Sequence, residues 1–129
     1  MDANQVRLVA LVALGGAVGS VARYGVSGWL TRGPFPWGTF VVNLTGTFLL
    51  ALLFYLSAAR GYLPADTRTF LFIGVFGGYT TLSTFGLETT EMLRSSQIAL
   101  ASANIALNGG ACLAGAVVGA MLGSALGGA

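Results

Sequence analysis

The sequence predicts an all-α integral membrane protein, with four transmembrane helices in a single domain that covers residues 1–129. First, 55% of the residues are hydrophobic and 8% are charged, whereas about a quarter of the residues of soluble domains are charged. Second, four apolar stretches reach the roughly 20 residues needed to cross a bilayer. Third, the third stretch carries glycines and hydroxyl residues at its centre, which predicts a helix broken in mid-membrane.

The composition also excludes several classes of function. The basic residues are six arginines spread singly along the chain, so no basic patch predicts binding to nucleic acid. The chain has no histidine and one cysteine, Cys112. A zinc or iron site of the usual ligand types and histidine-based acid–base catalysis are therefore excluded.

The four spans are predicted at about residues 7–30, 37–59, 68–92 and 98–126. Proline and glycine separate the first three spans, because neither residue continues a helix well. The first apolar run continues to Arg23 without a convincing cleavage site, so it is a span and not a signal peptide. Gly15 and Gly19 have the small-xxx-small spacing that lets a neighbouring helix approach closely.

The third span contains the stretch least compatible with a helix. Gly77 and Gly78 each weaken a helix by roughly 1 kcal/mol relative to alanine, and the hydroxyl residues that follow compete for backbone hydrogen bonds. Backbone groups freed in hydrocarbon persist only where they are buried in protein, line a wet cavity or hold an ion. One interpretation is a kink sealed by neighbouring helices. The other is that the carbonyls of Gly77 and Thr80 coordinate Na⁺.

The fourth span has two features with a period of four residues. Glycines form a ridge for close helix contact at positions Gly115, Gly119, Gly123 and Gly127. A polar stripe lies on one face of the same helix and comprises Asn104, Asn108 and Cys112.

Three further residues each have two interpretations. Asn43, near the middle of the second span, forms an interhelical hydrogen bond of about 0.6 kcal/mol, or its NH₂ group donates to an anion that has lost its water. Arg23 extends to the membrane interface, or it is a vestibule charge that concentrates anions at a pore mouth. Phe85 faces lipid or the core, or its positive ring edge lines an anion path.

The arginines give no preferred orientation. An even number of spans leaves both termini on one side, and three arginines flank each side: Arg7, Arg60 and Arg68 against Arg23, Arg32 and Arg94. This tie predicts insertion both ways round and an antiparallel, dual-topology homodimer. Two copies would then surround one central Na⁺ with carbonyls on the two-fold axis. The alternative is that the tie is coincidental and one orientation dominates.

Three blocks carry a resemblance to a known family: GGAVGSVARY at 15–24, GTFVVNLTGTF at 38–48 and GVFGGYTTLSTF at 74–85, which is followed by Glu88. They resemble the signature blocks of the Fluc (CrcB) fluoride channels of bacteria, over nearly the whole chain. The resemblance implies a channel and not an enzyme, with two antiparallel fluoride pores. It also implies a structural Na⁺ held by Gly77 and Thr80, and passive fluoride flow across the bacterial cytoplasmic (inner) membrane that lowers intracellular fluoride.

The resemblance also implies that Asn43 and the phenylalanines of the third block line the fluoride pore. Because fluoride holds its water tightly, the pore must replace that water with donors. The expected pore residues are Asn43, Leu82, Ser83, Thr84, Phe85 and Asn108, with Arg23 in the vestibule. Leu82 stands where the family pattern has a phenylalanine, either as a natural variant or as a substitution. Leucine has no ring edge, so we expect the fold to persist and fluoride flow to fall.

Two other functions compete with a fluoride channel. A small dual-topology, proton-coupled multidrug exporter needs a carboxylate inside the membrane, and the first span offers none. The candidates are Glu88 and Glu91, near the end of the third span. An assembly protein of the membrane would need neither a broken helix nor a central asparagine.

Overall fold

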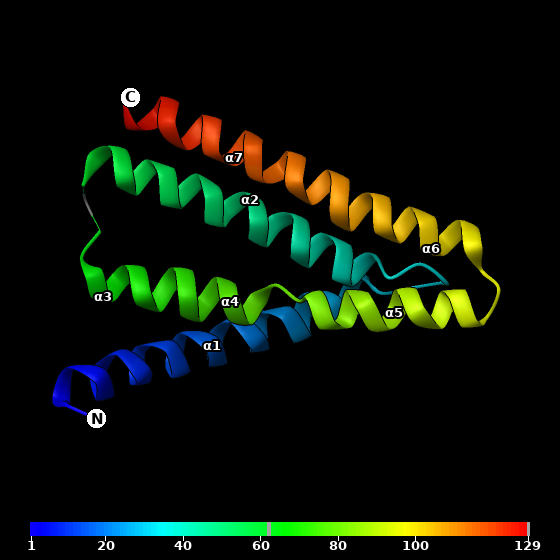
Figure 1. Cartoon of the computed structure of the whole chain (residues 1–129), viewed down its shortest axis with the longest axis horizontal. Helices are drawn as coiled ribbons and strands as arrows, with labels where there is room; N and C mark the ends of the chain where they lie inside the picture. Colours follow the sequence, from blue (N-terminus) through cyan, green and yellow to red (C-terminus); the bar gives the residue numbers. More distant parts are fainter. Residues whose placement is uncertain (62, 129) are drawn as a thin grey trace.

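Four long helical spans make up the computed structural model, which describes residues 1–61 and 63–128 and contains no strand among them. Each span is long and apolar enough to cross a membrane; they cover Ala3–Leu30, Trp37–Arg60, Ala65–Arg94 and Ile98–Gly127. Both ends of the chain lie at the same end of the molecule (Figure 1). The predicted all-α membrane fold with four spans is confirmed. Tyr62, in the predicted loop between the second and third spans, and Ala129 lie outside the described residues.

The first span is the single helix α1, Ala3–Leu30, which begins before the predicted start near residue 7. Asp2 and Gln5 form a capping box: the Gln5 amide donates to Asp2 Oδ1 over 2.8 Å, and the Asp2 amide donates to Gln5 Oε1 over 3.0 Å. These polar bonds satisfy amides that the first turn would leave free. The helix therefore extends about one turn beyond its apolar stretch.

The second span, α2 (Trp37–Arg60), packs along the fourth span, which consists of α6 (Ile98–Ile105), η2 (Ala106–Ala111) and α7 (Cys112–Gly127). The predicted glycine ridge makes this contact. A Cβ atom on Gly119 would collide with the carbonyl of Phe48, and one on Gly123 would collide with the carbonyl of Leu52. The absence of side chains lets the two backbones meet, as the four-residue spacing predicts.

The third span is divided into α3 (Ala65–Arg68), η1 (Thr69–Val75), α4 (Phe76–Tyr79) and α5 (Leu82–Arg94). Gly77 and Gly78, where the break was predicted to begin, remain helical within α4. The extended residues are Thr80, with φ −75° and ψ 157°, and Thr81, with φ −150° and ψ 116°. Thr81 is the N-cap of α5, and its hydroxyl accepts from the Thr84 amide. An N-cap residue has extended backbone, so a new helix starts after Thr81.

Two segments, η1 and η2, are π-helical. Their hydrogen bonds skip one residue more than those of an α-helix, and no residue type in the sequence marks them. The backbones of η1 and α1 are in close contact: a Cβ on Gly15 would be 2.9 Å from the Cα of Gly74. η2 carries Asn108, a member of the polar stripe.

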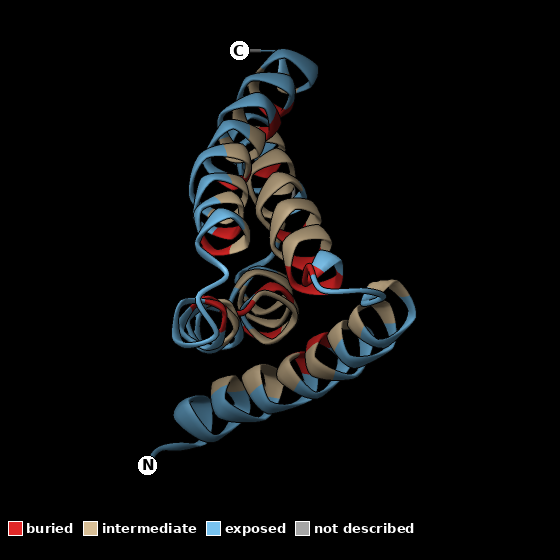
Figure 2. Cartoon of the chain, turned by 90° about the vertical axis from the view of Figure 1, so that its right-hand side faces the viewer, coloured by how far each residue is buried: buried red, intermediate tan, exposed pale blue. Residues whose placement is uncertain are grey.

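The protein core is thin, and apolar side chains cover the outside. Buried residues lie where the helices meet, whereas the outer faces of the spans are exposed (Figure 2). Exposed apolar side chains include Val21, which is 72% exposed, and Leu113, which is 67% exposed. Apolar patches of this extent are typical of surfaces that face lipid or another protein, so the burial pattern agrees with a membrane location.

The contact between α1 and η1 gives a first prediction. Gly15→Ala places a methyl group against the carbonyl of Phe70 and 2.9 Å from the Cα of Gly74. Overpacking of this kind costs about 1–3 kcal/mol, so we expect a lower melting temperature in detergent micelles by circular dichroism. Gly16→Ala is the matched control, because a Cβ there meets nothing within 4 Å and alanine favours a helix by about 1 kcal/mol. Equal melting temperatures for the two variants would contradict the packing argument.

Candidate ion-conduction site

The extended residue Thr81 is paired with the side chain of Asn43 on α2. The Thr81 amide donates to Asn43 Oδ1 over 2.8 Å, and Asn43 Nδ2 donates to the Thr81 carbonyl over 3.0 Å. Both backbone groups of Thr81 are thereby satisfied by one side-chain amide. Such pairing matters because an unsatisfied backbone group in an apolar interior costs several kcal/mol, on the order of 2–7 kcal/mol.

The extended backbone at Thr80 and Thr81 leaves two carbonyls without their helical donors. In an unbroken helix the Thr81 amide would donate to Gly77 and the Thr84 amide to Thr80, four residues back. Here the Thr81 amide donates to Asn43, and the Thr84 amide donates to Thr81 Oγ1 over 3.2 Å. The carbonyls of Gly77 and Thr80, predicted from the sequence as cation ligands, lack those helical donors.

A row of asparagines connects Asn43 to the fourth span and back to α5. Asn43 Nδ2 donates to Asn108 Oδ1 over 2.8 Å, and Asn108 Nδ2 donates to Asn104 Oδ1 over 2.8 Å. Asn104 Nδ2 then donates to Thr89 Oγ1 on α5 over 3.0 Å. Two of the residues in the predicted polar stripe therefore face the second and third spans.

A first cavity of about 270 Å³ lies beside this row of asparagines. Its lining joins the predicted pore residues Asn43, Leu82, Phe85 and Asn108 to Thr47, Thr80, Thr81, Gly109 and Cys112. Leu82 is 80% exposed, so it lies at the open side of the cavity. The cavity combines amide and hydroxyl groups with apolar side chains.

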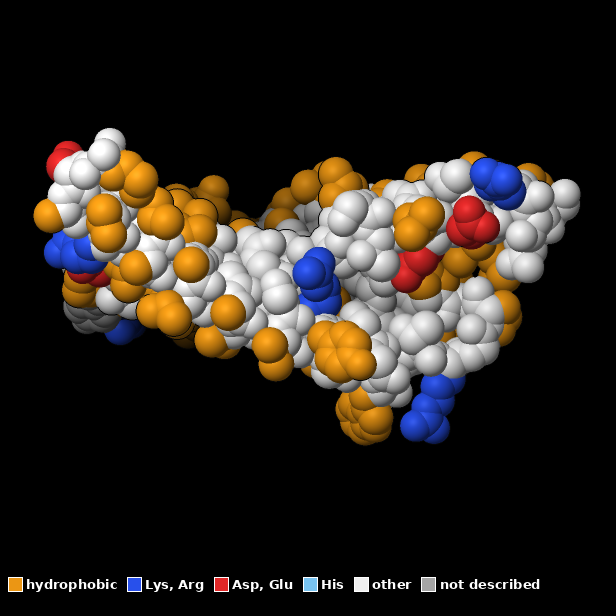
Figure 3. All heavy atoms as spheres, turned by 90° about the horizontal axis from the view of Figure 1, so that it is seen from below, with side chains coloured by type: hydrophobic (Ala, Val, Ile, Leu, Met, Phe, Trp, Pro, Cys, Tyr) orange, Lys and Arg blue, Asp and Glu red, His pale blue; other side chains and the backbone are white. Residues whose placement is uncertain are grey.

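A second cavity of about 390 Å³ lies between α1, α2 and α5. It contains the predicted vestibule residue Arg23 and the predicted pore residue Thr84, together with Ser20, Tyr24, Ser27, Thr31, Thr39, Thr81 and Glu88. Figure 3 views the chain from the α1 side and shows charged side chains near both ends and in the middle of this face. Thr81 lines both cavities, so the predicted pore residues fall on two sides of it.

One predicted pore residue lies in neither cavity. Ser83 is exposed, and its hydroxyl lies 3.3 Å from Thr81 Oγ1. The Thr81 hydroxyl also donates to Thr84 Oγ1 over 3.0 Å. From the sequence alone, Thr81 had no predicted role of its own among the hydroxyl residues of the break; its spacing of three residues from Thr84, typical of an N-cap, was the available signal.

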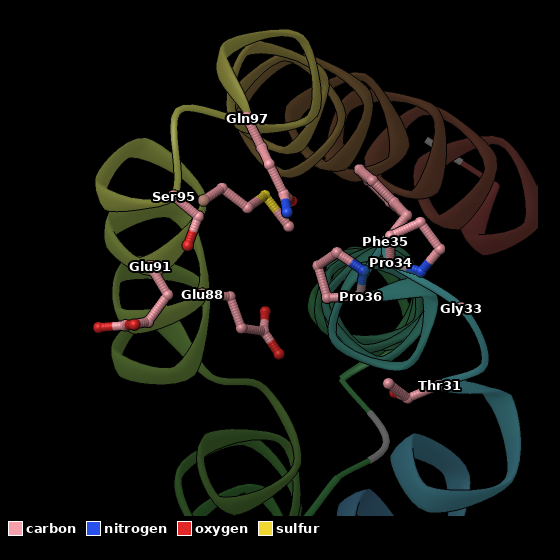
Figure 4. A pocket seen from close by; sticks show the side chains of 10 residues that line it. Thr31, Gly33, Pro34, Phe35, Pro36, Glu88, Glu91, Ser95 and Gln97 are labelled. Carbon is pink, nitrogen blue, oxygen red and sulfur yellow. The ribbon is translucent and has the colours of Figure 1, made fainter.

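Glu88 is a polar residue that lines the second cavity and also a third one. Thr39 donates to Glu88 Oε1 over 2.7 Å, and the buried Oε2 has no hydrogen-bond partner in the described part of the chain. Glu88 also lines a third cavity of about 340 Å³ next to the segment 33–36. In Figure 4 its carboxylate points toward that segment, whereas the Glu91 carboxylate points away. From the sequence, Glu88 was a candidate for proton coupling and the residue that follows the third family block; its contact with Thr39 was not predicted.

Comparison with known proteins identifies similar sequences over most of the chain. The profile of a family described as "CrcB-like protein, Camphor Resistance (CrcB)" matches residues 10–120. A "Fluoride-specific ion channel FluC" from Magnetococcus marinus is 43% identical over 119 residues, which are 89% of this chain and 96% of that protein.

Two further relatives have the same kind of name. A "Fluoride-specific ion channel FluC" from Nitrobacter winogradskyi is 46% identical over 113 residues, 81% of this chain and 88% of the relative. A "Fluoride-specific ion channel FluC 1" from Methanosarcina acetivorans is 43% identical over 99 residues, 75% of this chain and 76% of the relative.

The pairing of Asn43 with Thr81 gives a second prediction. Asn43→Ala leaves the Thr81 amide and carbonyl without their partner, at a cost of about 1–3 kcal/mol for each buried group. We expect faster hydrogen–deuterium exchange in peptides that cover residues 79–84. Thr47→Val is the control, because Thr47 lines the same cavity but its hydroxyl donates only within its own helix, to the Asn43 carbonyl. Unchanged exchange in Asn43→Ala would show that Asn43 does not hold the extended segment.

Proposed function

This chain belongs to the CrcB-like family, whose profile covers residues 10–120, and from this membership we propose that it is a fluoride-specific ion channel. The observation that carries the proposal is that relatives with 43% and 46% identity over most of the chain are named as such channels. The chain is a multi-pass membrane transporter and not an enzyme. We further propose that fluoride flows passively across the bacterial cytoplasmic (inner) membrane and that this flow lowers intracellular fluoride.

The proposed path for fluoride runs through the first and second cavities, which both have Thr81 in their lining. Arg23 attracts anions from the water into the second cavity, as a vestibule charge would. Inside, hydroxyl and amide hydrogens replace water around the ion, and the ring edge of Phe85 adds a weak positive contact. We expect the width of this path to exclude larger halides. Thr84, Leu82 and the asparagines complete the proposed lining.

An antiparallel second copy of the chain completes the proposed channel. Leu82 lines the first cavity and is 80% exposed in the single chain, so the cavity is open on this side and a second copy would close it. In the proposed homodimer the two copies are inserted in opposite directions, in keeping with the balanced arginines of the sequence. The extended residues Thr80 and Thr81 then lie in mid-membrane at the centre of the dimer.

We propose that the dimer holds one structural Na⁺ at this centre. The carbonyls of Gly77 and Thr80 have lost their helical amide donors to Asn43 and Thr81. Free carbonyls of an interrupted membrane helix are ligands suited to a small hard cation. Two such carbonyls from each copy would surround the ion, and its charge would offset part of the cost of bringing an anion into a low-dielectric interior.

The channel function gives a third prediction. Proteoliposomes loaded with fluoride, with potassium allowed to move through an ionophore and no proton gradient, should release fluoride, which an ion-selective electrode detects.

Leu82→Phe should increase the rate of fluoride release a few-fold, because a ring-edge contact contributes about 0.5–1.5 kcal/mol. Leu87→Phe is the control, since Leu87 is also exposed on α5 but is absent from the lining of the first two cavities. Release no faster than from protein-free liposomes would refute the channel function, and equal rates for Leu82→Phe and the parent would refute only the role of the ring.

The dual topology gives a fourth prediction. Single cysteines are introduced in a Cys112→Ala background at Ala3 and at Ser95, which lie at opposite ends of the spans. If the balanced arginines allow both orientations, a membrane-impermeant maleimide added outside intact cells should label about half of each variant. Complete labelling of one variant and none of the other would mean that one orientation dominates.

A further inference from the structure

The hydrogen-bonded row of asparagines leaves α5 and returns to it. It starts at the Thr81 amide, the N-cap of α5, and passes through Asn43, Asn108 and Asn104. From Asn104 it reaches Thr89, whose hydroxyl donates to the carbonyl of Phe85 over 2.7 Å. At every step the residue nearer the Thr81 amide is the donor and the next residue is the acceptor. Hydrogen bonds in such a chain polarise and strengthen one another. We call this series of bonds the amide relay.

The amide hydrogens that face the first cavity are all engaged. A side-chain amide carries two hydrogens. Those of Asn43 go to the Thr81 carbonyl and to Asn108 Oδ1. Those of Asn108 go to Asn104 Oδ1 and, over 3.3 Å, to the Asn104 carbonyl. An anion that enters this cavity therefore has to take a hydrogen from an acceptor that now holds it.

The acceptor easiest to replace is Asn108 Oδ1. The Asn43 side chain makes two hydrogen bonds to the Thr81 backbone, one through its oxygen and one through its nitrogen. Its third hydrogen bond, to Asn108 Oδ1, can therefore break without releasing Thr81. The position of Asn108 depends in turn on Asn104. Asn104 is 0% exposed, is anchored to Thr89 and lines neither of the first two cavities.

We propose that Asn104 is a positioning residue for anion passage, which acts through Asn108 by holding its oxygen in competition with the anion for the Asn43 amide hydrogen. This inference rests on the proposed fluoride function. Bonds from an amide to a charged acceptor are stronger than bonds to a neutral one, so a compact anion with concentrated charge displaces Asn108. A larger, weaker acceptor such as chloride does not. The amide relay is thereby a source of selectivity that needs no contact between Asn104 and the ion.

The test compares fluoride and chloride release from proteoliposomes for the parent, Asn104→Leu, Asn108→Leu and the double variant. Asn104→Leu removes the side-chain hydrogen bond from Asn108 and keeps the backbone carbonyl that Asn108 also contacts. We expect its ratio of fluoride to chloride rate to fall about tenfold, which corresponds to about 1.4 kcal/mol. Because Asn104 acts through Asn108, the double variant should be no less selective than Asn108→Leu alone. A purely structural role would instead give additive losses.

One further variant serves as a control, and a second replaces Asn104→Leu if that variant does not fold. Ser102→Ala alters the same helix, α6, at an exposed position and should keep the parent ratio. Should Asn104→Leu fail to fold, as judged by gel filtration, Thr89→Val carries the test, because it removes only the hydroxyl that anchors Asn104 and should lower the ratio in the same direction.

The outcomes separate this inference from the function on which it rests. A parent chain that releases no fluoride would refute the proposed function. A parent that releases fluoride, with an unchanged ratio in folded Asn104→Leu or in Thr89→Val, would overturn the role of Asn104 alone. Additive losses in the double variant would overturn the action through Asn108.

Discussion

The hydrocarbon of a membrane offers no water to backbone groups, and this constraint makes the bond pair between Asn43 and Thr81 central to the structure. An extended residue within an apolar span needs a partner for its amide and for its carbonyl. Asn43 supplies both from a neighbouring helix. Once that need is met, the start of α5, the two cavities that share Thr81 and the amide relay can all be placed around one residue.

Close backbone contacts hold this arrangement in position. α1 meets η1 through Gly15 and Gly74, and α7 meets α2 through Gly119 and Gly123. In a bilayer, helices gain little free energy from burying apolar surface against each other, because lipid is equally apolar. Their association therefore depends on close packing and on polar bonds between helices. The glycines provide the close packing, and Asn43 provides polar bonds between helices. The polar groups are thus kept at fixed distances although few side chains are buried.

Much of this fold could be predicted from the sequence, because hydropathy and small-residue spacing are signals that add up along a helix. The four spans and the glycine ridge are of this kind. The extended residues Thr80 and Thr81 lie inside the stretch 77–84 that propensity marked. The glycines of that stretch do not leave the helix: Gly78 is helical and a Cβ there would lie 2.6 Å from the Gly16 carbonyl. Capping and a bond from another span, rather than propensity, set the extended backbone at Thr81.

The candidate site was predicted in part for a similar reason. Asn43 and Asn108 were recognised separately, but residues 65 positions apart reveal their contact only in the folded chain. Ser83, chosen for its hydroxyl, lies outside the first two cavities. Asn104 was assigned to the polar stripe, whereas its bond to Thr89 depends on how the turn at 95–97 folds α6 back beside α5.

The π-helical segment η2 has a practical consequence for mapping the last span. Across Ala106–Ala111 the chain has more residues per turn than in the α-helices on either side, because its hydrogen bonds span five residues instead of four. A helical wheel drawn through all of Ile98–Gly127 with 3.6 residues per turn therefore goes out of phase at its centre. Scanning mutagenesis of this span should assign its faces with two separate wheels, one for α6 and one for α7, or residues that face lipid will be counted with those that face protein.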